Sequence, residues 1–328
     1  MNDHDRDFQC APVLLICFNR PDFLCDLIAT IAPARPSRVF VAVDGPRADH
    51  PNDEVLCART RSAIDAIDWP CEVQTLFHER NLGCMHAPPE AITWFFSQVS
   101  AGIILEDDIR PSISFLRFAS ELLERYSDDA RIGMISAANP YGFITAKDDS
   151  YLFTKDVAIW GWASWARVWK HYDVEPEHYI GDFESIVSRT FVTSRGKKLF
   201  RRYFSGLLKS RSTWDVQFGL TIWRNDLLCI RPRVNLAGNC GFIVDSTHTG
   251  SFSYDMDRFA CRGQIDFPIV HPNSVARDVE ADRMNELRSF GFLPRVATVL
   301  GLRLGRFGMF FVNVFRKIEG VYPALMRF

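Results

Sequence analysis

The sequence predicts an α/β protein whose mostly parallel sheet is covered by helices on both faces. Two short apolar runs, at 12–18 and 38–43, each end in polar residues and a turn that contains proline. Stretches with apolar residues at helical spacing follow both runs, and strands that alternate with helices in this way form βαβ units. With 328 residues, 47% of them hydrophobic, the chain has enough apolar side chains for a large core.

Each expected element follows from the pattern of its own stretch. Branched apolar residues without alternation indicate strands buried on both faces, whereas 71–77 alternates as a half-buried strand does. The expected strands are 12–18, 38–43, 71–77 and 102–105, and the expected helices are 22–31, 53–67, 88–99 and 112–126. Ligands of such sheets bind beyond the carboxyl ends of the strands. The polar residues expected to meet there are Asn19, Arg20, Asp44 and the triplet Glu106-Asp107-Asp108.

The chain divides into four expected parts with no long linker between them. Residues 10–133 are expected to form a first lobe, and 134–250 a second lobe that shares its core and holds six of the eight tryptophans. Residues 251–291 are expected to be an irregular connecting segment. Residues 292–328 are expected to form a basic, apolar C-terminal helix that either lies in a membrane interface or packs on the protein with its basic side chains solvated.

Composition excludes several classes of partner and location. Lys plus Arg (38) nearly balances Asp plus Glu (40), so we expect no nucleic-acid partner. The polar, acidic stretch at 1–12 does not resemble a secretory signal, and nine cysteines without a CxxC pair fit reduced thiols. These features predict a cytoplasmic protein, with peripheral contact to the inner face of the membrane if the C-terminal helix binds there.

The acidic triplet Glu106-Asp107-Asp108 directly follows an apolar strand. Adjacent carboxylates at a half-buried strand end repel and desolvate one another unless something positive neutralises them. A divalent cation with hard oxygen ligands, Mg²⁺ or Mn²⁺, meets that need and would bridge a substrate diphosphate. The alternative is structural, because Asp107 and Asp108 could instead cap the helix expected at 112–126.

Short motifs along residues 10–250 together resemble one family. The motifs are Cys17-Phe18-Asn19-Arg20, Asp44-Gly45, Asn81-Leu82-Gly83, Gly102-Ile103-Ile104-Leu105-Glu106-Asp107-Asp108-Ile109, Ser136-Ala137-Ala138-Asn139, Trp160-Gly161-Trp162, Trp214-Asp215 and Cys229-Ile230-Arg231-Pro232. On these motifs the chain resembles the animal N-acetylglucosaminyltransferases that initiate complex N-glycan branches, and more closely the bacterial GT-A-like proteins sometimes labelled hemolytic-protein-like.

The resemblance implies a GT-A fold and an inverting, metal-dependent glycosyltransferase. The first lobe would bind a nucleoside-diphosphate sugar, expected to be a UDP-sugar, and the tryptophan-rich second lobe would bind a glycan or lipid-linked acceptor in bacterial surface polysaccharide synthesis. Asp108 is then the metal ligand. The donor-binding residues would be Asn19, Arg20, Asp44, Glu106, Asp107, Trp214 and Arg231.

The family's Trp-Asp pair implies Asp215 as the general base that deprotonates the acceptor hydroxyl. This chain carries Val216 where the relatives have a second acid, which leaves the base assignment open. The rival role for Asp215 is to cap the helix expected at 216–222.

Several further residues have two interpretations each. Trp160, Gly161 and Trp162 either form an acceptor wall, with the glycine allowing close backbone approach, or belong to the core. Without the resemblance, Arg20 fits a surface ion pair and Asp44 a turn cap. Asn239 and His248 are candidate contacts in a loop over bound donor, although a lone histidine is more often structural.

Two other functions remain as alternatives. A sugar-nucleotide nucleotidyltransferase would use a similar sheet, but the turn Asn19-Arg20-Pro21-Asp22 lacks the glycines that usually hold a triphosphate. A non-catalytic, membrane-associated protein of hemolysin type would leave the triplet and Asp215 unexplained.

Overall fold

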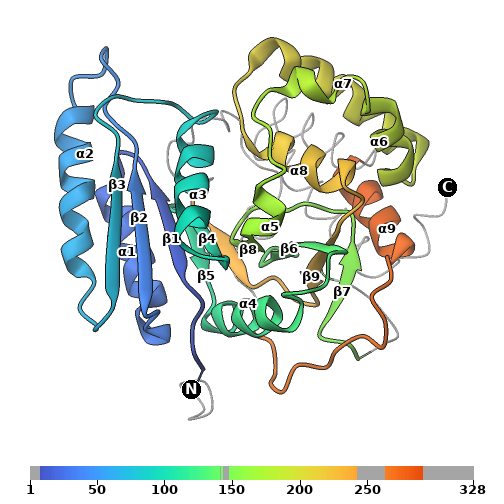
Figure 1. The fold of residues 1–328 in the computed structure, drawn as a ribbon, viewed down its shortest axis with the longest axis horizontal. Helices are drawn as coiled ribbons and strands as arrows, with labels where there is room; N and C mark the ends of the chain where they lie inside the picture. The colour runs from blue at the N-terminus through green and yellow to red at the C-terminus, as the bar shows by residue number, and fades with distance from the viewer. Residues whose placement is uncertain (1–7, 141, 143–147, 242–262, 291–328) are drawn as a thin grey trace, which may run out of the picture.

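The structure, a computed structural model, describes residues 8–140, 142, 148–241 and 263–290, and it confirms the α/β class (Figure 1). The main sheet contains β1 Val13–Cys17, β2 Arg38–Val43, β3 Glu72–Phe77, β4 Ala101–Glu106, β6 Ile132–Ser136, β7 Tyr151–Thr154, β8 Trp162–Trp165 and β9 Leu228–Pro232. A small second sheet pairs β5 Ile109–Pro111 with β10 Ala237–Asn239. The sequence did not predict β5 or β10, each only three residues long.

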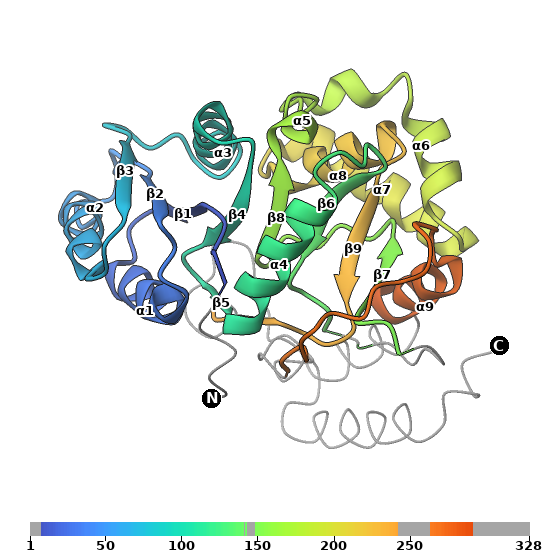
Figure 2. The ribbon, with the colours of Figure 1, turned by 60° about the horizontal axis from the view of Figure 1, so that its bottom comes forward.

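The helices flank this sheet. They are α1 Pro21–Ile31, α2 Asp53–Ser62, α3 Ala87–Gln98, α4 Ile113–Arg125, α5 Ala166–Trp169, α6 Phe183–Thr190, α7 Ser194–Ser210, α8 Asp215–Arg224 and α9 Val279–Phe290. Short 3₁₀ turns occupy Ala32–Ala34, Ala63–Ala66 and Pro176–Tyr179. Figure 2 shows α1 and α4 on one face of the sheet and α3, α5 and α8 on the other.

The main sheet has the strand order β3-β2-β1-β4-β8-β6-β9-β7. The first four of these strands are parallel, with Leu15 of β1 opposite Val41 of β2 on one side and Leu105 of β4 on the other. Strand β8 runs antiparallel to both β4 and β6. Every residue of β1 is buried, as the unbroken apolar run predicts for a strand covered on both faces. The chain order reverses around β1, where such sheets place their ligand crevice.

A serine begins the helix that follows the acidic triplet. Ser112 is the N-cap of α4, and its hydroxyl accepts a hydrogen bond from the backbone N–H of Phe115. The side chains of Asp107 and Asp108 do not occupy that position. The structural alternative for the triplet is therefore wrong, and its charges need another explanation.

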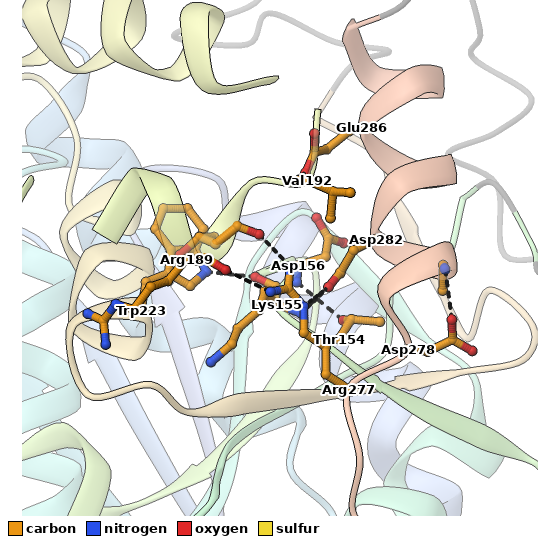
Figure 3. A network of polar contacts seen from close by, with 12 residues as sticks. Thr154, Lys155, Asp156, Arg189, Val192, Trp223, Arg277, Asp278, Asp282 and Glu286 are labelled. Atoms are coloured by element: carbon orange, nitrogen blue, oxygen red, sulfur yellow. Dashed lines mark hydrogen bonds and ion pairs between the residues drawn. The ribbon is translucent and has the colours of Figure 1, made fainter. Parts of the chain in front are cut away.

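Residues 279–290, expected to be irregular, form the helix α9, which packs near β7 and α7 (Figure 1). Two buried acidic residues of this helix, Asp282 and Glu286, attach it to the rest of the protein. Asp282 accepts hydrogen bonds from the backbone N–H of Lys155 (3.0 Å) and from Arg277 Nε (2.6 Å), and Glu286 accepts from the N–H groups of Val192 and Thr193 (Figure 3). The sequence pattern did not predict α9, because this helix has few apolar residues. It packs on the protein through polar contacts and not through an apolar stripe.

No helix in the described ranges has the length and apolar character to cross a membrane. The expected C-terminal helix at 292–328, the stretch 251–262 and the candidate loop residue His248 lie outside the described residues.

Candidate active site

The acidic triplet and Arg20 meet because β1 and β4 are neighbouring parallel strands. Ile16 of β1 lies opposite Glu106 of β4, and the N–H of Asp107 donates to the carbonyl of Ile16 at 3.0 Å. Both strands then end at the carboxyl edge of the sheet. Arg20, three residues beyond β1, is thus placed beside Asp107 and Asp108, as the sequence predicted for this edge.

Arg20 holds Asp107 with two hydrogen bonds. Its Nη2 contacts Asp107 Oδ1, its Nε lies 3.2 Å from Oδ2, and Nη2 is also 3.5 Å from Asp108 Oδ2. Burial raises the pKa of Asp107 to about 6, although the charge of Arg20 opposes the shift. The ion pair is therefore an internal part of the crevice, and the surface alternative for Arg20 does not apply.

Arg110 is a second cation at the triplet, and the sequence did not single it out. Its Nη1 donates to the carbonyl oxygen of Asp107 at 2.7 Å, and its guanidinium lies over the ring of Phe23. Arg20 also lies over this ring, with its Cζ 4.9 Å from the centroid. Two arginines and one aromatic ring thus fix the turn that carries the acids. In the sequence, the signal for this role is the position of Arg110, a basic residue two positions after the triplet.

Glu106 and Asp108 each keep one buried carboxylate oxygen without a hydrogen-bond partner, Oε1 and Oδ1 respectively. Burial raises the pKa of Glu106 to about 8, and the negative charges of Asp108, Asp215 and Asp107 raise it further than Arg20 lowers it. Buried polar atoms normally have partners, so two orphaned oxygens only two residues apart in the chain indicate a site that lacks positive charge.

Asp215 approaches the same acids from the second half of the chain. It is the first residue of α8, after the N-cap Trp214, and its Oδ1 accepts a hydrogen bond from the Thr213 hydroxyl. After burial and the charge of Asp108, the negative charge of Asp215 helps to raise the pKa of Glu106. Asp215 is not the N-cap of α8, because Trp214 occupies that position and Asp215 is already inside the first turn.

The stretch 239–241 lies directly against Asp108. Asn239 pairs with Ile109 across the small sheet, and the N–H of Cys240 donates to the Asp108 carbonyl at 2.8 Å. A Cβ atom on Gly241 would lie 2.4 Å from Asp108 Oδ2, so only glycine allows this approach. Asn239 turns its Oδ1 to the N–H of Gly241 (2.8 Å), which fixes the local turn.

Asp44 and Asn19 occupy the predicted edge of the sheet, but protein contacts use their side chains. The buried carboxylate of Asp44 accepts hydrogen bonds from the backbone N–H groups of Leu82 and Gly83 and from Asn81 Nδ2. These contacts are those of the turn-capping alternative, and donor binding by Asp44 stays a prediction. Asn19 donates to Asp53 Oδ1 at 2.8 Å.

Two of the predicted tryptophans are core residues. Trp162 is 1% exposed and its ring centroid lies 4.7 Å from that of Phe218, while Trp214 is 2% exposed. Neither ring offers a face to a ligand, which corrects both expected roles. Gly161 has a φ of +72°, so its left-handed backbone requires glycine whatever binds nearby. Trp160 is partly exposed.

Arg231 is also placed away from the acids. It is 3% exposed and forms an ion pair with Asp156. Its strand, β9, is three strands from β4, which carries the acids, about 14 Å at the usual strand spacing. Arg231 thus belongs to a buried ion pair in the second half of the sheet, and its contact with a donor stays a prediction.

Among the described residues, no group of three His, Cys, Asp or Glu side chains is arranged to hold a metal. The orphaned oxygens of Glu106 and Asp108 nevertheless fit a hard cation, since Mg²⁺ is usually held by one or two carboxylates, water and substrate phosphates. These two residues are the candidates to hold Mn²⁺ or Mg²⁺.

Comparison with known proteins gives no family model and no curated protein that matches. Solved structures match in part: a UDP-glucose pyrophosphorylase complexed with UDP-glucose (10% identity, 71% of this chain and 94% of that chain, TM-score 0.36) and HddC from Yersinia pseudotuberculosis complexed with GMP-PN (11%, 49% and 80%, 0.31). A third is 4-diphosphocytidyl-2C-methyl-D-erythritol synthase from Anaerococcus prevotii (8%, 59% and 84%, 0.28). At these TM-scores the likenesses carry no argument about function.

Proposed function

We propose that this protein is a divalent-cation-dependent transferase that acts on a nucleoside-diphosphate sugar, and that it transfers the sugar to an acceptor hydroxyl. The observation that carries the proposal is the pair of buried, unpartnered oxygens of Glu106 and Asp108, with Arg20 3.5 Å from Asp108 and the charge of Asp215 acting on Glu106. A cation bound there would neutralise charge that develops on the departing diphosphate.

The chain's own residues have separate parts in this reaction. Asp215 accepts the proton of the acceptor hydroxyl while the oxygen of that hydroxyl forms a bond to the anomeric carbon. The bond from that carbon to the diphosphate breaks on the opposite face, and its electron pair leaves with the nucleotide, so the configuration inverts. Arg20 keeps Asp107 in place and adds positive charge beside Asp108. The proposal also includes a uridine base in the donor and a bacterial glycan or lipid-linked acceptor, and both of these identities are inferred from the sequence resemblance.

Nucleotidyl transfer is the second candidate. In that reaction a sugar phosphate attacks the α-phosphorus of a nucleoside triphosphate and pyrophosphate leaves, and the same two carboxylates could hold the cation. We favour glycosyl transfer because only Phe18, Asn19 and Arg20 connect β1 to α1, and this turn has no glycine to cradle a triphosphate.

The first experiment measures UDP binding by calorimetry with and without Mn²⁺. The wild-type protein should bind UDP at least about tenfold more tightly with the cation, and Asp108→Ala should lose that dependence. Asp148→Ala, a fully exposed acid, is the matched control. Equal UDP binding with and without Mn²⁺ in the wild type would refute the cation site.

The second experiment identifies the products. A panel of nucleotide sugars should release UDP in the presence of Mn²⁺, whereas UTP with sugar 1-phosphates should release no pyrophosphate. Pyrophosphate release would instead establish the second candidate.

A further inference from the structure

A cavity of about 830 Å³ lies between α7, α9 and the segment that follows β7. It is separate from the acidic triplet, none of whose residues lines it. Its apolar wall consists of Val157, Phe191, Leu199, Phe200, Tyr203, Leu207 and Trp223. A volume of this size accommodates a small organic ligand.

One face of α7 supplies much of this wall. Leu199, Tyr203 and Gly206 follow one another at helical spacing and all line the cavity. Tyr203 remains 54% exposed, although such a large ring would gain from being covered. A Cβ atom on Gly206 would have nothing within 4 Å, so the wall is open at this point.

The cavity reaches the candidate base. Thr213 lines it, and the Thr213 hydroxyl donates a hydrogen bond to Asp215. A ligand that fills the cavity as far as Thr213 therefore ends beside the side chain that hydrogen-bonds Asp215.

The charged groups of the lining mostly have protein partners. Figure 3 shows Lys155, Asp156, Asp282 and Glu286 within the polar network at α9. Lys155 Nζ pairs with Asp226 at 2.7 Å, Asp156 with Arg231, and Asp282 with Arg277. Glu286 accepts hydrogen bonds from the backbone N–H groups of Val192 and Thr193, and Arg202, the remaining charged residue of the lining, is exposed. Because the buried charges of the lining have protein partners and the wall is apolar, the cavity suits an uncharged, apolar ligand better than a phosphate.

We propose that this cavity binds the apolar part of the acceptor, which is a glycoside whose sugar hydroxyl meets Asp215 and whose hydrophobic aglycone lies along α7. The inference rests on the proposed glycosyl transfer for the identity of the sugar end. It adds a substrate class, amphipathic glycosides, and a specificity surface formed by Leu199, Tyr203, Phe200 and Trp223.

The test uses two glycosides that differ only in the aglycone, methyl and octyl β-D-glucopyranoside, the latter below its micelle concentration. Binding is followed by tryptophan fluorescence, since Trp223 lines the cavity. Octyl glucoside should bind on the order of 100-fold more tightly than methyl glucoside, because several methylenes leave water. Gly206→Phe places a ring in the open space and should remove most of that preference.

Gly181→Phe is the matched control, because Gly181 also has open space around its Cβ position but does not line the cavity. It should bind octyl glucoside as the wild type does. Unchanged octyl glucoside binding in Gly206→Phe, or equal binding of the two glycosides, would overturn the proposal. UDP and Mn²⁺ binding, measured on the same variants, tests the donor site separately, so failure of the cavity and failure of the proposed transferase give different results.

Discussion

Individual residues at the end of β4 determine how much positive charge the crevice needs. Arg20 and Arg110 are both turned toward Asp107, through its carboxylate and its carbonyl. Glu106 and Asp108 keep orphaned oxygens beside them. The two arginines thus stabilise the turn without neutralising all of its acids, and this remaining demand is what a cation would meet.

Gly241→Ala should weaken Mn²⁺-dependent UDP binding by about tenfold or more. The added Cβ would lie 2.4 Å from Asp108 Oδ2, so either the carboxylate or the stretch 239–241 must move. Calorimetric titration of UDP with Mn²⁺ measures the effect. Gly181→Ala, where the added Cβ meets open space, should bind as the wild type does. Wild-type affinity in Gly241→Ala would separate Asp108 from the nucleotide site.

Asp215→Asn should bind UDP and Mn²⁺ normally but lose about 10²- to 10⁴-fold in sugar transfer, because the amide cannot accept the acceptor's proton. The side chain keeps its shape and can still accept the hydrogen bond from Thr213. Steady-state transfer assays beside UDP calorimetry distinguish catalysis from binding. Retained turnover would remove Asp215 as the base.

At the scale of elements, the sequence predicted those whose pattern reflects their own burial. The runs that became β1, β2 and β4 are apolar throughout because helices cover both of their faces. Helix α9 was not predicted because its docking depends on Asp282 and Glu286, whose partners lie about 90 to 130 residues away in the chain. Spacing within one segment carries no information about such contacts.

The sequence predicted where several site residues lie but did not predict which side chains they contact. Strand ends placed Arg20 beside the triplet, because parallel neighbours end at one edge. Asp44 also lies at a strand end, but the returning loop at 81–83 occupies its carboxylate, which only the tertiary structure reveals. For Trp162, the sequence cannot distinguish a core residue from a sugar-binding residue, because both roles suit an aromatic side chain. Its packing against Phe218 in the structure makes that distinction.

Replacement of Asp282 by Asn should flatten the dependence of stability on pH between about 4 and 6. Burial raises the pKa of Asp282 to about 6 from the ordinary 3.8, although Arg277 opposes the shift. The folded protein therefore binds this proton more tightly than the unfolded chain, and the stabilisation is present below pH 3.8 and is lost as the pH rises through about 6.

Urea unfolding of both proteins at several pH values measures the difference. The free energy of unfolding of the wild type should fall by up to about 3 kcal/mol relative to Asp282→Asn between pH 4 and 6. Parallel curves for the two proteins would show that Asp282 titrates normally and that its ion pair with Arg277 outweighs its burial.

For the whole molecule, one sheet connects the two lobes. Strand β8, from the second half of the chain, lies between β4 and β6, and its Trp162 and Trp165 pair with residues of β4. One core cluster includes Phe40 of β2 together with Trp162 and Phe218. A second, smaller cluster, which includes Phe183, Phe204 and Leu220, packs α6, α7 and α8 together. Because the sheet and the larger cluster still join both halves of the chain, we expect a single cooperative transition.

Phe40→Ala should therefore destabilise both halves equally. The ring is fully buried against Trp94 and Phe95, and its loss should cost about 3–5 kcal/mol. Six of the eight tryptophans lie beyond residue 134, so fluorescence mainly reports the second half, whereas far-ultraviolet circular dichroism reports both. Both signals should shift to the same lower urea midpoint. Val55→Ala, 62% exposed, should stay within about 0.5 kcal/mol of the wild type. A fluorescence midpoint that stays in place while the dichroism midpoint falls would show that the second half folds independently, despite the strands that it shares with the first.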